Sequence, residues 1–305
     1  MTSVLCLGEA LIDVVHRTGN APSEHVGGSI LNVASGLARL DHDTRLATWI
    51  GHDERGVRIA ETATVAGVRL VEGSDGAAHT PVANAHIDAE GKATYDFDLE
   101  WRVPALDGVG EVGHLHTGSF AATLEPGGSD VLEAVRTMGR TASVSYDPNA
   151  RPALMGTADL VRERIEQIVA ASDLVKASDE DLAWLYPDRS AEAVLDGWIA
   201  LGPKLVVVTR GADGASARMA GRPELVDLAP NVVDVGDTVG AGDSFMAGMV
   251  SSLLDQGLLG SREAVERLER ARVDQVREAL ARAIKTSAIT VSHVGAYSPT
   301  RDELG

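Results

Sequence analysis

VGDTVGAGDSF, at residues 235–245, places a Gly-Ala-Gly turn directly before an acidic residue and an apolar run. Alanine and methionine in the residues that follow favour helix, so we expect a helix to begin near Gly242. The first amides of a helix have no partner inside it, and glycines let a ligand approach them closely. Such a helix N-terminus is an anion site, above all for phosphate.

Asp243 follows this turn, where a carboxylate repels phosphate. A chemical reason for its position is proton abstraction from a hydroxyl group that attacks phosphorus. The alternative is that the acidic residue only caps the helix. Evidence from the rest of the chain is needed to choose between them.

Composition limits the classes of protein that this chain can belong to. Its 305 residues are 44% hydrophobic, which is ordinary for a globular protein with a large core. The net charge of -18 argues against a nucleic-acid partner and against an anionic membrane, because no net field attracts polyanions. A small phosphate ligand stays compatible with this charge.

Cys6 is the single cysteine and lies in an apolar run, so we expect a buried thiol without a disulfide. No apolar run reaches the ~18 residues of a membrane span, and the first residues lack a secretory signal pattern. We therefore expect a cytoplasmic protein with no membrane partner.

Short apolar runs alternate with amphipathic stretches. Expected strands are residues 4–7, 45–50, 114–116, 143–147, 173–176 and 205–209, and expected helices are 30–40, 57–66, 129–138, 158–171 and 191–201. This alternation predicts an α/β fold with a parallel sheet covered on both faces. Ligands bind such sheets at the carboxyl ends of the strands. Towards the C-terminus we expect helix over 262–287 and a closing strand at 288–291.

Two segments interrupt the alternation. Residues 13–18 resemble a short strand, and 83–88 and 92–98 flank a glycine-containing turn at 89–91, as in a hairpin. We interpret about 12–26 and 80–103 as a small β lid within a single domain of residues 1–305. A lid excludes water, which would otherwise hydrolyse a phosphoryl donor bound beneath it. Its exposed edges favour a homodimer.

Two common nucleotide-binding classes are disfavoured, because no Walker A sequence occurs and residues 27–32 do not form a GxGxxG fingerprint. Five motifs instead follow one another, and the 235–245 signature comes after them: GEALID at 8–13, GG at 27–28, GHDERG at 51–56, DPN at 147–149 and TRG at 209–211. Together they resemble the PfkB (ribokinase-like) carbohydrate kinases over essentially the whole chain, and most closely the bacterial fructokinases. The resemblance implies a three-layer α/β/α sandwich with a mostly parallel central sheet and a small β lid.

By this resemblance, Asp243 is the catalytic base. Gly240, Ala241 and Gly242 would donate amides to the charge that builds on the phosphoryl oxygens.

The sugar contacts are carried over from the same family. They are Asp13, Gly27, Gly28 and Asn32, with Phe97 and Tyr95 from the lid and Arg151 after the DPN motif. A carboxylate and an amide can bracket neighbouring hydroxyls. The alternatives are a turn residue for Asp13, a solvated position for Asn32, lid packing for the aromatic pair and a surface ion pair for Arg151.

Lys176, Ser178 and Asp181 occupy the place where relatives carry Asn-x-x-Glu near Mg²⁺ and phosphate. Asp181 replaces the glutamate, so its shorter carboxylate would reach Mg²⁺ through water. Thr209 and Gly211 end a strand and are expected beside the nucleotide phosphates.

The resemblance also implies a monovalent-cation loop behind the anion site. In this chain it would be formed by Asp237, Val239, Val291, His293 and Gly295, with K⁺ as the ion.

The function that this sequence favours is ATP- and Mg²⁺-dependent phosphorylation of a sugar primary hydroxyl, with D-fructose as the first candidate. A 2-keto-3-deoxygluconate kinase, a ribokinase and a nucleoside kinase are alternatives within the class. A catalytically silent sugar- or nucleotide-binding regulator is the alternative from another class, although the intact residues 240–243 argue against it.

Overall fold

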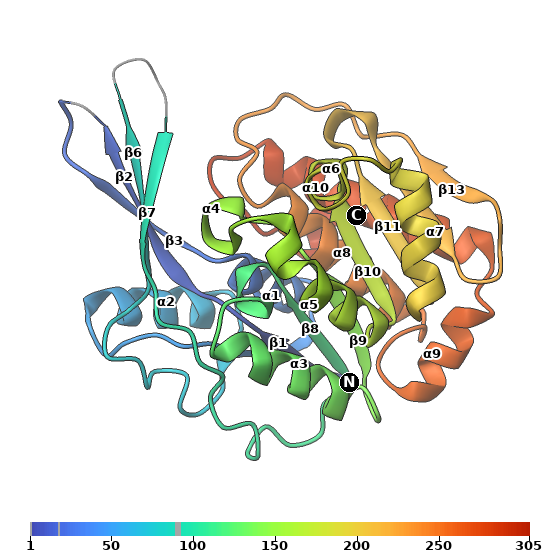
Figure 1. Cartoon of the computed structure of the whole chain (residues 1–305), viewed down its shortest axis with the longest axis horizontal. Coiled ribbons are helices and arrows are strands. Elements are labelled where there is room, and N and C mark those ends of the chain that lie inside the picture. The colour runs from blue at the N-terminus through green and yellow to red at the C-terminus, as the bar shows by residue number, and fades with distance from the viewer. Residues whose placement is uncertain (1, 18, 89–92) are drawn as a thin grey trace.

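A nine-stranded sheet forms the centre of the computed structural model, which describes residues 2–17, 19–88 and 93–305 (Figure 1). Neighbouring strands pair in parallel except at one edge, where the next-to-last strand in sequence runs antiparallel to both of its neighbours. In spatial order they are β13 (Leu225–Leu228), β12 (Ala215–Met219), β11 (Leu205–Thr209), β10 (Leu174–Ser178), β9 (Ser143–Asp147), β8 (His114–Gly118), β1 (Ser3–Leu7), β4 (Asp43–Ala47) and β5 (Arg69–Leu70). The expected mostly parallel sheet is confirmed.

Helices cover both faces of this sheet. They are α1 (Ser29–Arg39), α2 (Glu54–Val65), α3 (Gly127–Met138), α4 (Pro152–Met155), α5 (Ala158–Ala170), α6 (Asp179–Leu185), α7 (Ala191–Leu201), α8 (Ala241–Asp255), α9 (Arg262–Glu269), α10 (Val273–Val291) and α11 (Arg301–Leu304), with 3₁₀ turns η1 (Phe120–Ala122) and η2 (Gly211–Asp213). No helix within the described ranges is long and apolar enough to cross a membrane.

Alternation along the strands divides the core into two layers, because successive side chains of a strand point to opposite faces. In β1, Val4 and Cys6 pack with α1, α8 and α10, and the Cys6 thiol is buried as expected. Leu5 and Leu7 pack on the other face with α3, α5 and α7. The expected three-layer sandwich is therefore confirmed.

A second, four-stranded sheet stands to one side of the body (Figure 1). Its order is β3 (Ser23–Gly27), β2 (Leu11–Arg17), β6 (Val82–Ile87) and β7 (Ala93–Asp98), and the neighbours are antiparallel except β2 and β6. This is the small β sheet that the sequence predicts. The turn expected at 89–91 and residue 18 lie outside the described residues. The homodimer expected from the edges of this sheet stays a prediction.

The closing strand expected at residues 288–291 was wrong, since these residues form the last turn of α10. Their β-branched composition suggested a strand, but Ala288 continues the buried stripe of Ile284 at helical spacing. The helix expected over 262–287 is also divided into α9 and α10. The β12–β13 hairpin was not anticipated.

Close contact between α8 and α10 depends on Gly248. A Cβ built on this glycine would collide with the Oγ1 of Thr286 and come within 2.9 Å of the Cα of Ala283, both on α10. The Thr286 hydroxyl donates to the carbonyl of Ser244 at 2.9 Å, which ties α10 to the first turn of α8. The position of α8 against α10 thus depends on a contact that only glycine at residue 248 allows.

We expect Gly248→Ala to lower the free energy of unfolding by about 1–3 kcal/mol, because the added methyl overpacks the α8–α10 contact. Urea denaturation measures this change. Gly197→Ala in α7 is the matched control, since its Cβ would meet only the flexible guanidinium of Arg189, at 3.0 Å. That variant should be neutral or stabilised by about 0.5–1 kcal/mol. Equal effects in the two variants would contradict a tight contact.

Candidate active site

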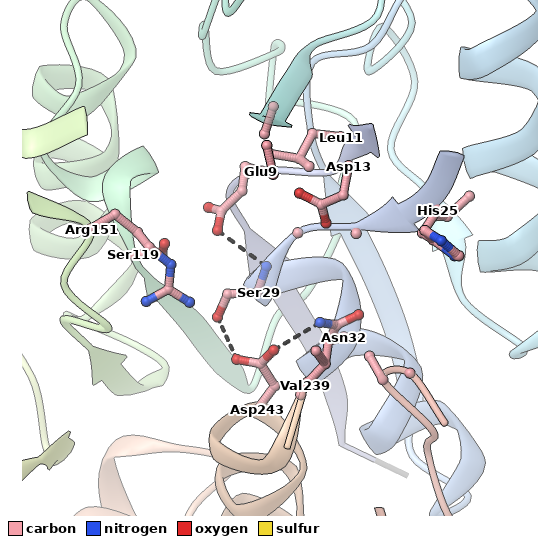
Figure 2. A pocket seen from close by; sticks show the side chains of 18 of the residues that line it. Glu9, Leu11, Asp13, His25, Ser29, Asn32, Ser119, Arg151, Val239 and Asp243 are labelled. Atoms are coloured by element: carbon pink, nitrogen blue, oxygen red, sulfur yellow. Dashed lines mark hydrogen bonds between the residues drawn. The ribbon is translucent and has the colours of Figure 1, made fainter. Parts of the chain in front are cut away.

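A cavity of about 1270 Å³ lies between the small sheet and the body (Figure 2). It opens where β1, β8 and β9 end, which is the carboxyl edge expected for ligands in a parallel sheet. The small sheet contributes one wall, and the other walls come from the start of α1, residues 149–154, 237–243 and 294–296. Segments far apart in the sequence therefore meet in one cavity.

The carboxylate of Asp243 is held in this cavity by three neutral donors. Ser29 donates its hydroxyl to Oδ1 at 2.6 Å, and Asn32 donates its side-chain amide to Oδ2 at 2.8 Å (Figure 2). Asn149 adds a longer contact to Oδ1 at 3.4 Å. Asp243 is only 6% exposed, and its bonds run to other segments rather than to the N-terminus of its own helix. The capping alternative is therefore not what the structure shows.

Ser29 and Asn32 reach Asp243 because they lie three residues apart on α1, which puts their side chains on one face of the helix. This face packs on α8, where a Cβ on Gly36 would come 2.6 Å from the Cβ of Ala247. Close packing of the two helices thus brings the donors to the acid.

The turn before Asp243 leaves amides free. Gly240 is the N-cap of α8 with a left-handed φ of 76°, and a Cβ there would meet the Cβ of Ala296 at 2.7 Å. Within the described residues, the N–H groups of Gly242 and Asp243 have no hydrogen-bond partner. Unpaired amides at the N-terminus of a fifteen-residue helix form a site suited to an anion.

All the expected sugar contacts line the cavity: Asp13, Gly27, Gly28, Asn32, Phe97 and Arg151, together with Tyr95. Gly27 leaves room for the Asp13 carboxylate, because a Cβ at residue 27 would displace the Oδ2 of Asp13. The Asp13 side chain is open to the cavity, yet partial burial raises the pKa of its carboxyl, while Arg151 and His25 oppose this rise.

The rings of Tyr95 and Phe97 are stacked, with centroids 6.3 Å apart, and both side chains line the cavity. Asp96 lies between them in sequence, and its carboxylate instead accepts hydrogen bonds from Asn84 and pairs with His86. Alternation along β7 therefore gives the lid one aromatic face.

Five residues expected near the nucleotide or Mg²⁺ do not line this cavity: Lys176, Ser178, Asp181, Thr209 and Gly211. Ser178 and Asp181 form a capping box at the start of α6, and the other Asp181 oxygen accepts the N–H of Ala150 at 2.8 Å. Both carboxylate oxygens are thus occupied by backbone amides, so the structure gives no support to a water-mediated Mg²⁺ contact. Lys176 is 2% exposed and bonds to Asp147 at 2.8 Å, rather than facing a phosphate.

The residues of the expected cation loop come together behind the turn. Asp237 accepts the N–H groups of Val239 and Gly295 at 3.1 and 3.0 Å, which lowers the pKa of its carboxyl. The carbonyl of Val291, expected as a cation ligand, accepts the amides of residues 236 and 237. The His293 ring stacks on Tyr297 with centroids 4.0 Å apart.

Three residues of the site were not assigned a role from the sequence: Glu9, Ser29 and Asn149. The signal for Ser29 is its three-residue spacing from Asn32, and Glu9 and Asn149 lie in the GEALID and DPN motifs. Glu9 is 4% exposed, and its Oε1 accepts the N–H of Ser29 at 3.2 Å (Figure 2). Among the described residues its Oε2 has no partner, and burial raises the pKa of the Glu9 carboxyl to about 8.

Comparison with known families assigns this architecture. The model of the pfkB family carbohydrate kinases matches residues 1–303. The chain belongs to the pfkB family of carbohydrate kinases. The expected carbohydrate kinase family is thereby confirmed, as is the likeness to bacterial fructokinases.

Individual relatives of this pfkB kinase support the same placement. The fructokinase of Rhizobium leguminosarum bv. trifolii is 34% identical over 88% of this chain and 85% of that protein. The ATP-bound fructokinase of Xylella fastidiosa has a TM-score of 0.84 at 24% identity, over 99% of this chain and 96% of the other. A fructokinase double mutant of Vibrio cholerae, in its fructose-, ADP- and potassium-bound form, has a TM-score of 0.82 at 24% identity. The match covers 100% of this chain and 97% of the other.

We expect Glu9→Gln to make stability less sensitive to pH. Between the ordinary glutamate pKa and the folded value of about 8, native wild type binds a proton that the unfolded chain does not. The stability due to neutral Glu9 is therefore full below pH 4.5 and is lost as pH rises through 8. Glutamine keeps the acceptor for Ser29 and cannot ionise.

Urea unfolding of both proteins at pH 5 and pH 8.5 tests this expectation. The variant should gain on wild type by up to about 4 kcal/mol between these pH values. A stability difference that is the same at both pH values would contradict a neutral buried Glu9.

Proposed function

We propose that this chain transfers the γ-phosphoryl group of ATP to the primary hydroxyl of D-fructose, giving fructose 6-phosphate. The observation that carries the proposal is the Asp243 carboxylate, fixed by Ser29 and Asn32 beside the free amides that begin α8. The name of the Rhizobium relative supports fructose as the acceptor.

In this proposal Asp243 accepts the proton of the attacking hydroxyl. Its two hydrogen bonds shorter than 3 Å hold the carboxylate plane. Oδ1 accepts from both Ser29 and Asn149, whereas Oδ2 accepts only from Asn32 and keeps a lone pair that can face the substrate. A phosphoryl transfer with a loose transition state needs the proton removed only as the new bond forms, so an ordinary carboxylate serves.

The turn of Gly240, Ala241 and Gly242 would stabilise charge on the transferred phosphoryl group. Preorganised amides are effective here because they need no reorientation as charge develops. The donors available for this are the unpaired N–H groups of Gly242 and Asp243.

The sugar would lie between Asp13 and Asp243. Asn32 already donates to Asp243, so its side-chain carbonyl is left to accept from a sugar hydroxyl. Asp13 would accept from neighbouring hydroxyls, Arg151 would contact an oxygen of the substrate, and Phe97 would cover the apolar face of the sugar. Closure of the small sheet over this group would exclude water.

Mg²⁺ would enter with the nucleotide. In the described parts of the chain no cluster of three or more His, Cys, Asp or Glu residues is arranged to hold a metal. An ion that is held mainly by substrate phosphates and water, as Mg²⁺ often is, does not need such a cluster. When bound, Mg²⁺ would neutralise charge on the phosphates.

An ADP-release assay with ATP and Mg²⁺ over fructose, ribose, 2-keto-3-deoxygluconate and adenosine tests the proposal. We expect fructose to give the highest kcat/KM. A clear preference for another acceptor would replace fructose while keeping the kinase, and no ADP release with any acceptor would favour a silent binding protein.

Asp243→Asn is the matched variant for this assay. It keeps the size of the side chain but removes the base, so kcat should fall by about 10²- to 10⁴-fold. Nucleotide affinity, measured by calorimetry, should change little. Near-normal turnover would refute Asp243 as the base.

We also propose that K⁺ orders the turn from behind, through Asp237 and backbone carbonyls of residues 239, 291, 293 and 295. The support is that Asp237 accepts the N–H groups of Val239 and Gly295 and donates its own N–H to the carbonyl of Val291, next to the turn. Activity in a K⁺-free buffer should rise when KCl is added, whereas the same concentration of tetramethylammonium chloride should have no effect. Identical rates in the two salts would count against the loop.

A further inference from the structure

A charged pair is buried behind the Gly-Ala-Gly turn, outside the cavity. The Lys176 ammonium contacts the Oδ2 of Asp147 at 2.8 Å, and the two side chains are 3% and 1% exposed. They lie on neighbouring strands, β10 and β9, and neither residue lines the cavity. A buried ion pair is often no more stable than an apolar replacement, so stability alone does not account for it.

Asp147 connects this pair to the base. Its Oδ1 accepts the N–H of Asn149 at 3.2 Å, which holds a residue whose φ of 35° is unusual for a side chain other than glycine. Asn149 in turn donates its side-chain amide to the Ser29 hydroxyl at 2.8 Å and to Asp243 at 3.4 Å. An unbroken chain of contacts therefore runs from Lys176 to Asp243.

Lys176 also lies directly against the turn. A Cβ built on Gly242 would be 3.1 Å from the Lys176 Nζ, so the ammonium sits where a side chain at 242 would be. Burial lowers the pKa of this lysine, but the carboxylates of Asp147, Asp181 and Asp243 outweigh it and hold the pKa above its usual value. The cation thus remains charged behind the amides that face the cavity.

We propose that Lys176 is a positioning residue for phosphoryl transfer, acting through Asp147 and the Gly242 backbone without touching nucleotide or sugar. This inference rests on the proposed function. The pair fixes the orientation of Asn149 and hence of Asp243, and its positive end offsets the repulsion between Asp243 and a phosphate bound at the same helix terminus. The positive charge of Lys176 thus compensates the negative charge of a carboxylate that lies beside an anion site.

The paired variant Lys176→Met/Asp147→Asn tests the proposal, because it removes both charges and leaves no uncompensated one. We expect kcat to fall by about 10- to 100-fold, as for a misplaced catalytic group, while KM for sugar and ATP stays within about twofold. Circular dichroism and a thermal melt verify that the variant is folded.

Arg262→Met/Asp173→Asn is the control, since this ion pair has the same contact distance of 2.8 Å and lies before the start of β10, outside the cavity lining. It should lower stability and leave kcat and KM at wild-type values. The inference is overturned if the Lys176/Asp147 variant keeps wild-type kcat. It is equally overturned if only KM for ATP rises tenfold or more, which would mean that Lys176 contacts the nucleotide.

Wild-type turnover, measured in parallel, separates this inference from the proposed function. Turnover in wild type with unchanged kinetics in the paired variant rejects the positioning role alone. Absence of turnover in wild type rejects the kinase and the positioning role together.

Discussion

The hydrogen bonds from α1 to Asp243 are the constraint on which the rest of the site depends. Ser29 and Asn32 bring neutral donors to a carboxylate that α8 presents at its first turn. This arrangement requires the two helices to lie close together, and small residues at Gly36 and Ala247 permit it. The candidate base and the candidate anion site are thereby placed on packed helices, while the small sheet lines another wall of the cavity.

In the proposed reaction, phosphate and a carboxylate would meet at one helix terminus, so the site would have to keep their negative charges apart. Neutral donors face Asp243 from the front, and Lys176 lies behind the turn with Asp147. Burial raises the pKa of the Glu9 carboxyl to about 8, so Glu9 is neutral near pH 7 and adds no negative charge near Asp243. The negative charge of Asp243 is therefore surrounded by neutral groups and by one buried cation.

Where prediction from the sequence failed, the cause was a contact between distant segments. Residues 288–291 have the composition of a strand, yet packing on α8 keeps them in α10. Lys176 and Asp181 were expected near phosphate and Mg²⁺ because they occupy the place where relatives carry an Asn-x-x-Glu motif. The structure turns them inward, to Asp147 and to the N-terminus of α6.

The sequence by itself determined six parallel strands of the sheet and the start of α8 at the Gly-Ala-Gly turn, because periodicity and helix signals are local properties. The order of its motifs, through their resemblance to a known family, gave the candidate base. Only the tertiary structure decided which side chains meet Asp243 and where the buried cation lies. Residues 29, 149, 176 and 243 come from four separate elements or loops. Their contacts exist only once the sheet and helices have packed, so no spacing along the chain could specify them.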